Sequence, residues 1–588
     1  MCIACNPGQL AIIRNAASRR DFLKYMSVAA TSAFVASAAG PAMAKAGHGK
    51  AGPAGTGPAD VIFSGGPIVT MNARAPQAEA VAVRGGRIVA VGRKQDIQGL
   101  AGPKTRMVDL KGRTMTPGFV EPHAHFVFVA FDDWINVSPI TTPDFDAVIA
   151  KIREGVSKTR PGEWVQVQEF DPSITRGARP LTLAVLDALA PDNPLFILEN
   201  NGHIAYANSA ALKLAGVTRD TPNPPGARFI RDANGDLTGK LEEMAAQAIF
   251  IHKMPQPSAA EFQRRVRRLF DLTASVGCTT FHDCGIGLLA GPKDLALLEA
   301  VVAGDAPVRY QGMLISTLFD QWENMGLKPG HGDDRFRLTG MKVWADGSNQ
   351  AKTGYQRENY LNSDKRGSLN FSVEQMTDTI RRAHNAGWQV GVHANGDAAI
   401  DATIDAYAAA LGGKSAGDLR HRIEHCSMLH PDQMARMKAL GLSPSFLIGH
   451  VYWWGKAFQE RIFGPERARF YDPCASALAA GLRISLHSDW NVTPIEPLRY
   501  MENAVTRIMN EGGGVFYPDE RIPVEAALRA VTIDAAWQCH MDDRAGSIEP
   551  GKFADLTILE DNPMTTSAPL SKIKVSETWM GGKQRYAS

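Results

Sequence analysis

Two histidines spaced one residue apart are the residues of this chain whose types and spacing most directly suggest chemistry. They are His123 and His125, near the end of the run TMTPGFVEPHAHF (114–126). In a β-strand, residues i and i+2 point to the same side, so both imidazoles would face one point in space. This spacing favours a metal-chelating pair, although two polar residues on the wet face of a strand would give the same pattern.

Three later apolar runs also lead to side chains that commonly bind metals. The run QVGVHANGD contains His393, HRIEHCS contains His425 and RISLHSDW contains Asp489. Neutral imidazoles together with carboxylates suit Zn²⁺ or a similar first-row divalent ion. If these runs and the first one are strands of one barrel, their ends can bring the five side chains to a single site.

The chain after residue 58 resembles the amidohydrolase superfamily, in particular the amidohydrolase-3 branch that contains N-substituted formamide deformylases. The stretches that carry the resemblance are TPGFVEPHAHF, NNGHIAYANSAAL (200–212), GCTTFHDCG (277–285), KVWADGS (342–348), the three runs above and GSIEPGKFADLTIL (546–559). The resemblance implies a metal-dependent hydrolase that acts on carbon–nitrogen bonds other than peptide bonds. The ligands that it implies for one or two divalent ions are His123, His125, Lys342, His393, His425 and Asp489.

The bridge between two such ions has two candidates in this chain. The resemblance implies that Lys342, at the end of the fourth barrel strand, is carboxylated by CO₂ and becomes an anionic bridge; an ordinary lysine paired with Asp346 is the alternative. In the related D-aminoacylases a cysteine bridges, and Cys284 stands at the corresponding strand end, where packing as a small buried hydrophobe is the other interpretation. Glu121 and His487 depart from the family pattern, which often has Asp and Gly there.

The expected reaction follows from these residues. A divalent ion lowers the pKa of water from 15.7 to about 7, and the hydroxide would attack an amide carbonyl carbon. Asp489 would take the proton and pass it to the leaving nitrogen, while the ion held by His393 and His425 would draw the carbonyl oxygen. We therefore expect hydrolysis of a small-molecule amide-type bond. The alternatives are a deaminase or esterase on the same barrel, or a non-catalytic metal- or ligand-binding relative.

Four further residues are candidates for contact with the substrate. Asn201 and His203 end a strand of an insertion that covers the active-site mouth in the family, and a loop histidine with a structural partner is the alternative for His203. His450 and Trp453 lie in the aromatic stretch FLIGHVYWW (446–454), which would otherwise serve as packing. The sequence does not specify the substrate.

The elements that must position these residues form a (β/α)8 TIM barrel. The apolar runs CTTFHDCG, VRYQGMLIS, RLTGMKVWADG, WQVGVHANG, RIEHCSM, LSPSFLIGH and LRISLHSD alternate with helical segments, and TMTPGFVEPHAH completes eight strands. In such barrels the chemistry lies at the carboxyl ends of the strands, where every candidate ligand falls. We place the barrel at 114–543, with an insertion at about 127–257 and a helix over 260–276 with one apolar face.

Both ends of the chain have the sequence pattern of short strands joined by turns. Residues 59–113 contain alternating runs, with Gly85 and Gly86 predicting a hairpin turn, and residues 544–588 repeat this pattern. We therefore expect a small β-sandwich that is built from both ends and flanks the barrel.

The first 58 residues have the features of an export leader. Arg19 and Arg20 precede a mildly apolar stretch that ends in Ala42-Met43-Ala44, which predicts a twin-arginine signal peptide at 1–44 and delivery to the periplasm by the twin-arginine translocase. A membrane-anchoring helix is the alternative. Residues 45–58 are rich in Gly, Ala and Pro and predict a flexible leader.

Composition limits the remaining classes. The 588 residues are 44% hydrophobic and 21% charged, which is ordinary for a globular protein. The formal net charge is +2, and loss of four Lys/Arg and one Asp with residues 1–44 makes it −1, so we expect a small-molecule substrate and no nucleic-acid partner. The seven cysteines are too sparse for a disulfide framework. The oligomeric state stays open.

Overall fold

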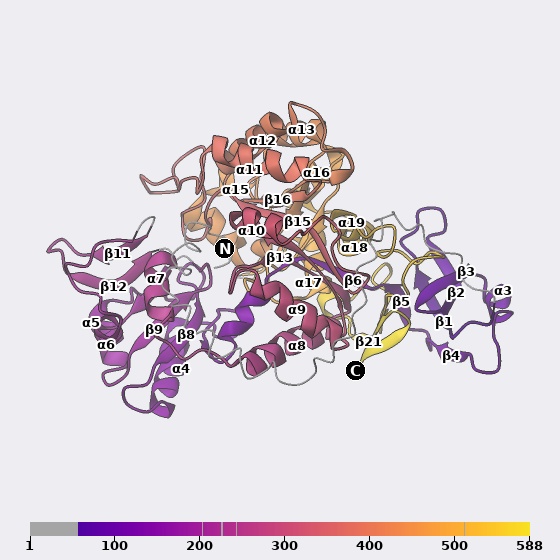
Figure 1. Ribbon diagram of the computed structural model, residues 1–588, viewed down its shortest axis with the longest axis horizontal. Coiled ribbons are helices and arrows are strands. Elements are labelled where there is room, and N and C mark those ends of the chain that lie inside the picture. The colour runs from indigo at the N-terminus through magenta and orange to yellow at the C-terminus, as the bar shows by residue number, and fades with distance from the viewer. Residues whose placement is uncertain (1–56, 203, 225–226, 243, 511) are drawn as a thin grey trace.

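The structure is a computed structural model that describes residues 57–588 apart from 203, 225–226, 243 and 511. Three sheets organise the described chain, and Figure 1 shows them side by side, with the barrel in the centre. The predicted export leader, apart from its last two residues, lies outside the described residues. No described helix combines the length and the apolar character that crossing a bilayer would require.

The central sheet is a barrel of eight parallel strands, which confirms the TIM-barrel-like α/β fold that the sequence predicts. Its neighbours run in the order β6, β13, β14, β15, β16, β17, β18 and β19, so each strand pairs with the next along the chain. The bounds are β6 Phe119–Ala124, β13 Cys278–Ile286, β14 Arg309–Ile315, β15 Phe336–Trp344, β16 Gln389–Ala394, β17 Arg422–His425, β18 Ser443–Phe446 and β19 Ser485–Leu486.

The barrel closes through the residues that follow its last strand. The Asp489 amide donates to the His123 carbonyl at 3.1 Å, and the His125 amide donates to the Trp490 carbonyl at 3.1 Å. The segment after β19 therefore pairs with the end of β6. This closure fixes two candidate histidines and the candidate aspartate against one another through backbone hydrogen bonds.

Helices surround the barrel in the positions expected for βα units (Figure 1). They are α8 Ala259–Ser275, α9 Lys293–Ala303, α10 Phe319–Asn324, α11 Val373–Asn385, α12 Asp397–Leu411, α13 Pro431–Leu440, α14 Gly449–Ala457, η6 Phe458–Ile462, α15 Pro465–Ala468, α16 Cys474–Ala479, α17 Pro497–Thr506, α18 Val524–Ala530 and α19 Ile533–Gln538. Helix α8 was predicted from its apolar face, and that face, with Phe262, Val266 and Leu269, is buried. The Ser258 side chain caps its first turn.

Both chain ends contribute to one further eight-stranded sheet. Its order is β22 Lys583–Ala587, β21 Val575–Met580, β20 Leu556–Leu559, β5 Thr114–Pro117, β1 Val61–Val69, β2 Gln77–Arg84 and β3 Arg87–Gly92, with β4 Arg106–Asp109 beside β1. The predicted turn at Gly85 and Gly86 joins β2 to β3, and both glycines have positive φ. The strands form one connected sheet, so the two-layered sandwich stays a prediction.

Strand β5 shows where the terminal sheet passes into the barrel. The sequence treated 114–126 as one barrel run, but Thr114–Pro117 pairs antiparallel with β20, and the barrel strand begins at Phe119. Gly118 lies between them, and a Cβ there would be 2.2 Å from the Thr279 hydroxyl oxygen. The close approach of the second barrel strand therefore requires glycine at this junction.

A six-stranded sheet lies between barrel strands β6 and β13 in the chain, at the left of Figure 1. Its order is β11 Arg228–Arg231, β12 Leu237–Glu242, β10 Ile204–Ala207, β9 Leu195–Glu199, β8 Val165–Phe170 and β7 Ile135–Asn136. Helices α4 Phe145–Lys158, α5 Leu183–Leu189, α6 Ser209–Ala215 and α7 Met244–Ile251 belong to the same segment. This region is called the insertion below; its domain boundaries remain predictions.

The insertion is bonded to the carboxyl ends of the barrel strands. The Trp454 indole of α14 donates to the Asp171 carboxylate at 2.9 Å, and the Arg461 guanidinium donates to the Ser173 carbonyl at 2.7 Å. After β19, the Asn491 amide donates to the Glu169 carboxylate at 3.2 Å. These contacts hold the insertion over the mouth of the barrel.

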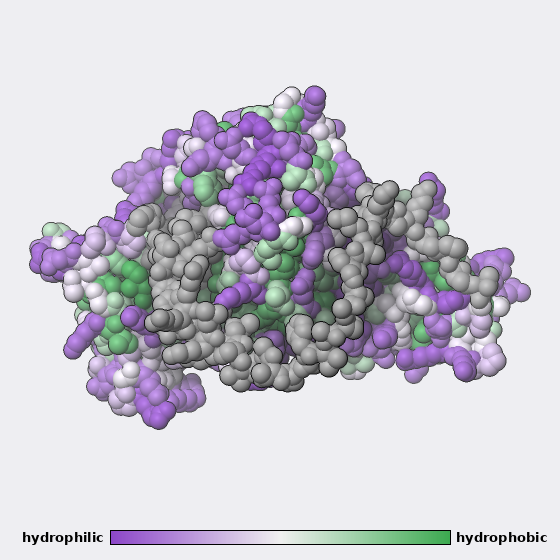
Figure 2. Space-filling model, in the orientation of Figure 1, coloured by the Kyte–Doolittle hydropathy of each residue, from purple (hydrophilic) through white to green (hydrophobic). Residues whose placement is uncertain are grey.

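The outer face of the barrel helices is mostly hydrophilic on the side shown in Figure 2. The larger exposed hydrophobic residues among those described lie on different elements, for example Met107 near the terminal sheet and Leu272 on α8. Scattered residues of this kind are normal on a folded surface and need no covering partner.

Candidate metal centre

His123 and His125 meet at the end of β6, inside the barrel. Their Nε2 atoms are 3.3 Å apart, and both side chains are fully buried. The Asp489 Oδ1 atom lies 3.2 Å from the Nε2 of His125 and 3.5 Å from that of His123. Two nitrogens and one carboxylate oxygen thus converge on one small volume, as the sequence predicted.

The tautomer of His123 follows from its other nitrogen. Its Nδ1 lies 2.7 Å from a carboxylate oxygen of Glu424, and an ionised carboxylate only accepts hydrogen bonds. Neutral His123 therefore carries its proton on Nδ1 and presents a lone pair on Nε2 toward His125 and Asp489. A carboxylate behind a ligating histidine is the usual way in which proteins orient a metal ligand.

Glu424 is kept ionised by its surroundings. Burial by itself would raise its pKa, but the charges of Arg422 and Lys342 and the hydrogen bonds from Arg422 hold the pKa at about 2. The Arg422 guanidinium donates to both oxygens of Glu424, at 2.7 and 2.9 Å, and also to the Pro122 carbonyl at 3.1 Å. This buried ion pair fixes the carboxylate that orients His123.

Glu424 contacts a histidine that is far away in the chain. Although Glu424 precedes His425 on β17, its carboxylate lies against His123. His425 ends β17 with a φ of 64°, in the left-handed region. That backbone conformation interrupts the strict alternation of a strand, so neighbouring side chains no longer point to opposite faces.

His393 and His425 lie together beside this pair. Their ring centroids are 4.5 Å apart, and that of His425 is 4.8 Å from that of His123. The Nδ1 of His425 is 3.9 Å from Asp489 Oδ2. Within the described chain, the buried Nδ1 of His393 has no hydrogen-bond partner, as expected for an atom that a metal ion would engage. The five predicted histidine and aspartate ligands are therefore brought to one place.

Lys342 reaches the same volume from β15. Its Nζ is 3.1 Å from His123 Nε2, so it occupies the position from which a bridging group could act. The alternative ion pair with Asp346 is not among the contacts of the described residues. Asp346 instead accepts hydrogen bonds from the backbone amides of Asn395, Gly396 and Tyr355, and burial raises its pKa to about 6.

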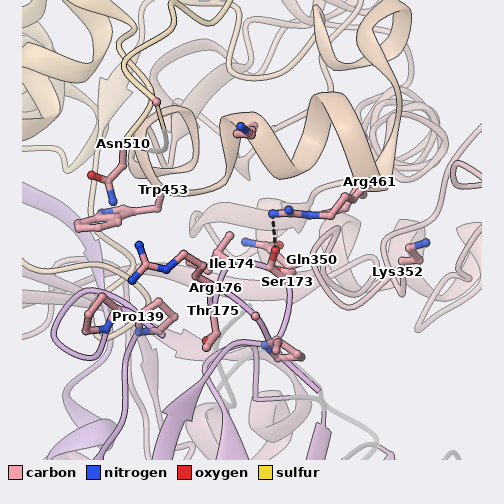
Figure 3. A pocket seen from close by; sticks show the side chains of 17 residues that line it. Pro139, Ser173, Ile174, Thr175, Arg176, Gln350, Lys352, Trp453, Arg461 and Asn510 are labelled. Carbon is pink, nitrogen blue, oxygen red and sulfur yellow. Dashed lines mark hydrogen bonds between the residues drawn. The ribbon is translucent and has the colours of Figure 1, made fainter. Parts of the chain in front are cut away.

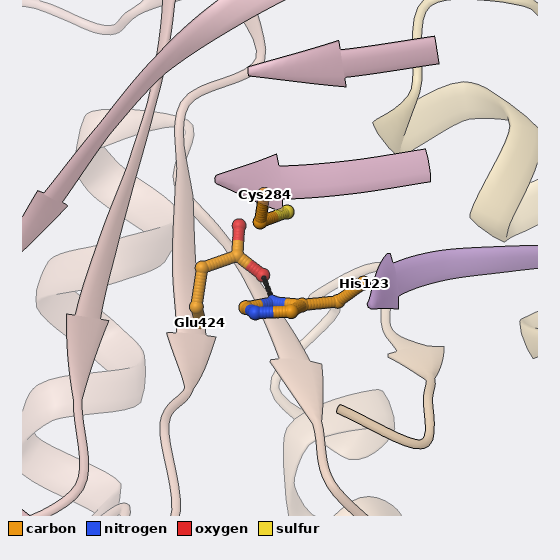
Figure 4. Close-up of side chains that lie close together, drawn as sticks. All are labelled: His123, Cys284 and Glu424. Atoms are coloured by element: carbon orange, nitrogen blue, oxygen red, sulfur yellow. Dashed lines mark hydrogen bonds and ion pairs between the residues drawn. The ribbon is translucent and has the colours of Figure 1, made fainter. Parts of the chain in front are cut away.

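Cys284 lies on the other side of Glu424, as Figure 4 shows. His123, Cys284 and Glu424 are close enough to resemble a second set of ligands. However, the Arg422 guanidinium is 3.7 Å from the Cys284 sulfur and donates to both oxygens of Glu424, so a further cation there would be repelled. Burial raises the pKa of the Cys284 thiol, which favours its neutral form. We interpret this set as the hydrogen-bonded support of His123.

Three buried residues that the sequence did not assign to the site also support it. Glu121 accepts from the amides of His123 and Ser488 and from the Tyr500 hydroxyl, and burial raises its pKa to about 8. His487 stacks on His123 with ring centroids 4.6 Å apart. Asp283 lies 3.7 Å behind the Nδ1 of His125. The aspartate in CTTFHDCG was the available signal for Asp283, because it lies near the carboxyl end of β13.

Of the four residues that were predicted to contact the substrate, the three that the structure describes lie in different surroundings. His203 lies outside the described residues. Asn201 is buried and donates to the Glu199 carboxylate at 2.5 Å, which places it in the hydrogen-bond network of the insertion. His450 is buried among Trp454, Phe458 and Tyr471. Trp453 lines a cavity of about 980 Å³ at the barrel mouth.

A second cavity, of about 350 Å³, adjoins the candidate centre. It is lined by Phe128, whose ring centroid is 6.2 Å from that of His125, and by Trp490, the residue after Asp489. Glu169 and Asn491 also line it, so the insertion and the barrel both contribute to its wall. Small molecules could therefore lie close to the centre from this side.

The chain is similar to several known proteins over most of its length. The model of the amidohydrolase family, Amidohydro_3, matches residues 106–586. N-substituted formamide deformylase of Arthrobacter pascens is 30% identical over 540 residues, which cover 90% of this chain and 98% of the relative. The putative amidohydrolase YtcJ of Bacillus subtilis is 27% identical over 539 residues, covering 89% and 99%. Protein LONG AFTER FAR-RED 3 of Arabidopsis thaliana is 29% identical, covering 90% and 92%.

Solved structures show the same fold. The structure of an uncharacterized metal-dependent hydrolase from Pyrococcus horikoshii superposes with a TM-score of 0.68 at 22% identity, covering 87% of this chain and 99% of that one. A similar protein from Pyrococcus furiosus gives a TM-score of 0.66 at 23% identity, covering 86% and 100%.

Proposed function

Because the chain belongs to the amidohydrolase family, we propose that it is a metal-dependent hydrolase that cleaves a non-peptide, amide-type C–N bond of a small molecule. The observation that carries the proposal is the lone pair of His123 Nε2, which Glu424 directs toward His125 Nε2 and Asp489 Oδ1. This donor set of two imidazoles and a carboxylate fits a first-row divalent ion, for which we propose Zn²⁺.

We propose that His123, His125 and Asp489 would hold one ion, and that His393 and His425 would hold a second. Lys342, 3.1 Å from His123 Nε2, is proposed to react with CO₂. In that reaction the ammonium first loses a proton, a bond then forms between the neutral Nζ and the carbon of CO₂ as one C=O π bond opens, and a second proton leaves Nζ, so a cation among the ligands becomes an anion. A bound ion would supply Lewis-acid polarisation and a lowered pKa of water.

The chain's own residues would handle the proton and the substrate. The Asp489 carboxylate faces the volume between the histidines and can accept the proton of the attacking water, then return it to the leaving nitrogen. Glu424 and Arg422 keep the His123 ring and its tautomer fixed. The insertion covers the mouth and limits access of bulk water, which strengthens electrostatic interactions inside.

The relative from Arthrobacter pascens suggests the first substrates to test. We expect the purified protein, with bound divalent metal, to hydrolyse members of a panel of N-substituted formamides, other N-acyl amines and cyclic imides, with release of amine and carboxylic acid measured by chromatography. Aminopyrimidines and aryl esters in the same panel test the deaminase and esterase alternatives. Turnover of only these two classes, or of none, would contradict the proposal.

We also propose that the protein reaches the periplasm by the twin-arginine route. Replacing Arg19 and Arg20 by Lys should retain the protein in the cytoplasm with its leader intact, because the translocase recognises the arginine pair. Fractionation and N-terminal sequencing measure this, and the wild-type mature chain should begin near Lys45. Replacing Arg14 by Lys is the matched control. Periplasmic delivery of the double variant would exclude the twin-arginine assignment.

A further inference from the structure

We propose that the 980 Å³ cavity at the barrel mouth, called the mouth cavity below, binds the carboxylate of an amide substrate that also carries an apolar or aromatic body. The proposal rests on the proposed function and narrows it to anionic amides such as N-acyl amino acids. It is argued from the position of the cavity, the sign of its charges and its apolar wall.

The mouth cavity lies between the insertion and the barrel. Residues 172–178 of the insertion form one side, and Gln350, Lys352, Trp453 and Arg461 contribute from the barrel (Figure 3). Gln350 and Lys352 follow β15, the strand that carries Lys342. Trp453 lies on α14, which follows β18. The barrel side of the cavity is therefore built at the carboxyl ends of strands, where the chemistry of this fold is located.

The loop that lines the cavity is bonded to the surroundings of His393. The Asn349 amide, next to Gln350, donates to the Asn395 carbonyl at 3.2 Å. The Asn395 side chain in turn lies 3.1 Å from His393 Nε2 and donates to the Gly347 carbonyl at 3.1 Å. A ligand in the mouth cavity would thus contact a loop that is continuous with the candidate metal centre.

Among the described residues that line the mouth cavity, the ionisable ones are all cations, namely Arg176, Lys352, Lys456 and Arg461. The cavity of 350 Å³ has the opposite character, because its ionisable lining residues are Asp132, Glu169 and Glu496. Positive charge is therefore a property of this one cavity and not of the whole mouth. A low-dielectric cleft lined by one sign of charge concentrates ligands of the other sign.

Lys352 is the cation that most needs a counter-ion. Arg176 pairs with Asp144 at 3.0 Å and Lys456 with Glu460 at 3.7 Å, whereas no ion pair of Lys352 occurs in the described part of the chain. Burial and the charge of Lys365 lower the pKa of Lys352. Arg461 reaches across to the insertion, where its guanidinium donates to the Ser173 carbonyl (Figure 3). A bound carboxylate would supply the missing negative charge.

The rest of the wall is suited to an apolar body. Pro139, Pro143 and Ile174 of the insertion line the cavity together with Trp453. Figure 3 shows Pro139 on the side of the cavity opposite the Trp453 indole. An indole offers a flat surface for a ring or an aliphatic chain. The combination of a flat apolar wall with cations favours an amphiphilic carboxylate over a strongly hydrated inorganic anion.

The test compares N-formylphenylalanine with its uncharged amide, N-formylphenylalaninamide, on the metal-loaded full-length protein. For Lys352→Met we expect kcat/KM for the acid to fall about tenfold, mainly through KM, because attraction to the carboxylate is lost. The uncharged amide should change less than about twofold, and salt should weaken binding of the acid more in the wild type than in Lys352→Met. Lys414→Met, at the exposed end of α12, is the matched control.

Two substitutions of Arg461 distinguish an effect of its charge from an effect on the structure. Arg461→Lys should keep most of the preference for the acid, while Arg461→Met should reduce it in the same direction as Lys352→Met. Equal losses for the acid and the amide in all variants would show a structural effect and overturn the inference.

Binding of phenylacetate, measured by calorimetry on the same proteins, makes the inference independent of turnover. If phenylacetate bound Lys352→Met more weakly than the wild type, and the wild type hydrolysed no amide, the carboxylate site would be supported and the proposed function contradicted. If the protein hydrolysed amides but Lys352→Met bound phenylacetate as the wild type does and kept its preference for the acid, the proposed function would be supported and the carboxylate site contradicted. If Lys352→Met weakened the binding of inorganic phosphate more than the binding of phenylacetate, the assignment of the cavity to carboxylates would be overturned.

Discussion

Replacing Lys342 by Ala is expected to lower hydrolysis by more than about 100-fold and to reduce the bound metal by one equivalent. The reason is geometric, because Lys342 Nζ is 3.1 Å from His123 Nε2. If the lysine is carboxylated, its removal takes away the anion that joins two ions. Metal analysis and initial rates measure the two effects. Short carboxylic acids should restore part of the rate by occupying the vacated volume.

Cys284→Ala is the matched control for that experiment. The thiol is buried, and the Arg422 guanidinium beside it would repel a metal ion. We therefore expect activity within about twofold of the wild type and a stability loss on the order of 1 kcal/mol from the small cavity. An inactive Cys284→Ala together with an active Lys342→Ala would show that the bridge is a thiolate. Carbon-13 NMR of protein equilibrated with labelled CO₂ would detect the carbamate directly.

Asp489→Asn is expected to lower kcat by a factor of about 10² to 10⁴, the usual contribution of general acid–base catalysis. The amide keeps the shape of the carboxylate but is a much poorer proton acceptor. At 1.36 kcal/mol for each factor of ten, this loss is a barrier increase of roughly 3 to 5 kcal/mol. Because Asp489 Oδ1 also lies 3.2 Å from His125 Nε2, metal content must be measured alongside.

The pH profile separates the two roles of Asp489. If the residue only ligates, extra metal should restore the rate of the Asn variant. If it also moves the proton, the rate should stay low at full metal occupancy, and the acidic limb of the kcat profile should disappear. A saturated variant with wild-type kcat would show that another group is the base.

Much of the fold could be predicted because barrel strands are short apolar runs with a polar residue at the end. His393, His425 and Asp489 each follow such a run, and the barrel brings strand ends together irrespective of their separation along the chain. The junction at Gly118 was missed because Thr114–Pro117 directly precedes the barrel strand in the chain and is buried like it. Composition does not show which sheet a strand will join.

The support of the site was less predictable. Glu424 and His425 are neighbours whose side chains would alternate in a regular strand, and only the positive φ of His425 changes that. Local pattern arguments assume regular backbone, so they fail where the backbone is strained for function. The contact of Glu424 with His123, 301 residues earlier in the chain, depends on the tertiary structure and so could not be predicted from local sequence pattern.

The most direct test of the central claim is a zinc titration of metal-depleted protein, followed by the rate of hydrolysis of an N-substituted formamide. We expect no measurable hydrolysis without metal and a rate that rises and saturates at one to two ions per chain, as His123, His125, His393, His425 and Asp489 become occupied. Full hydrolytic activity in protein shown to contain no divalent metal would contradict it.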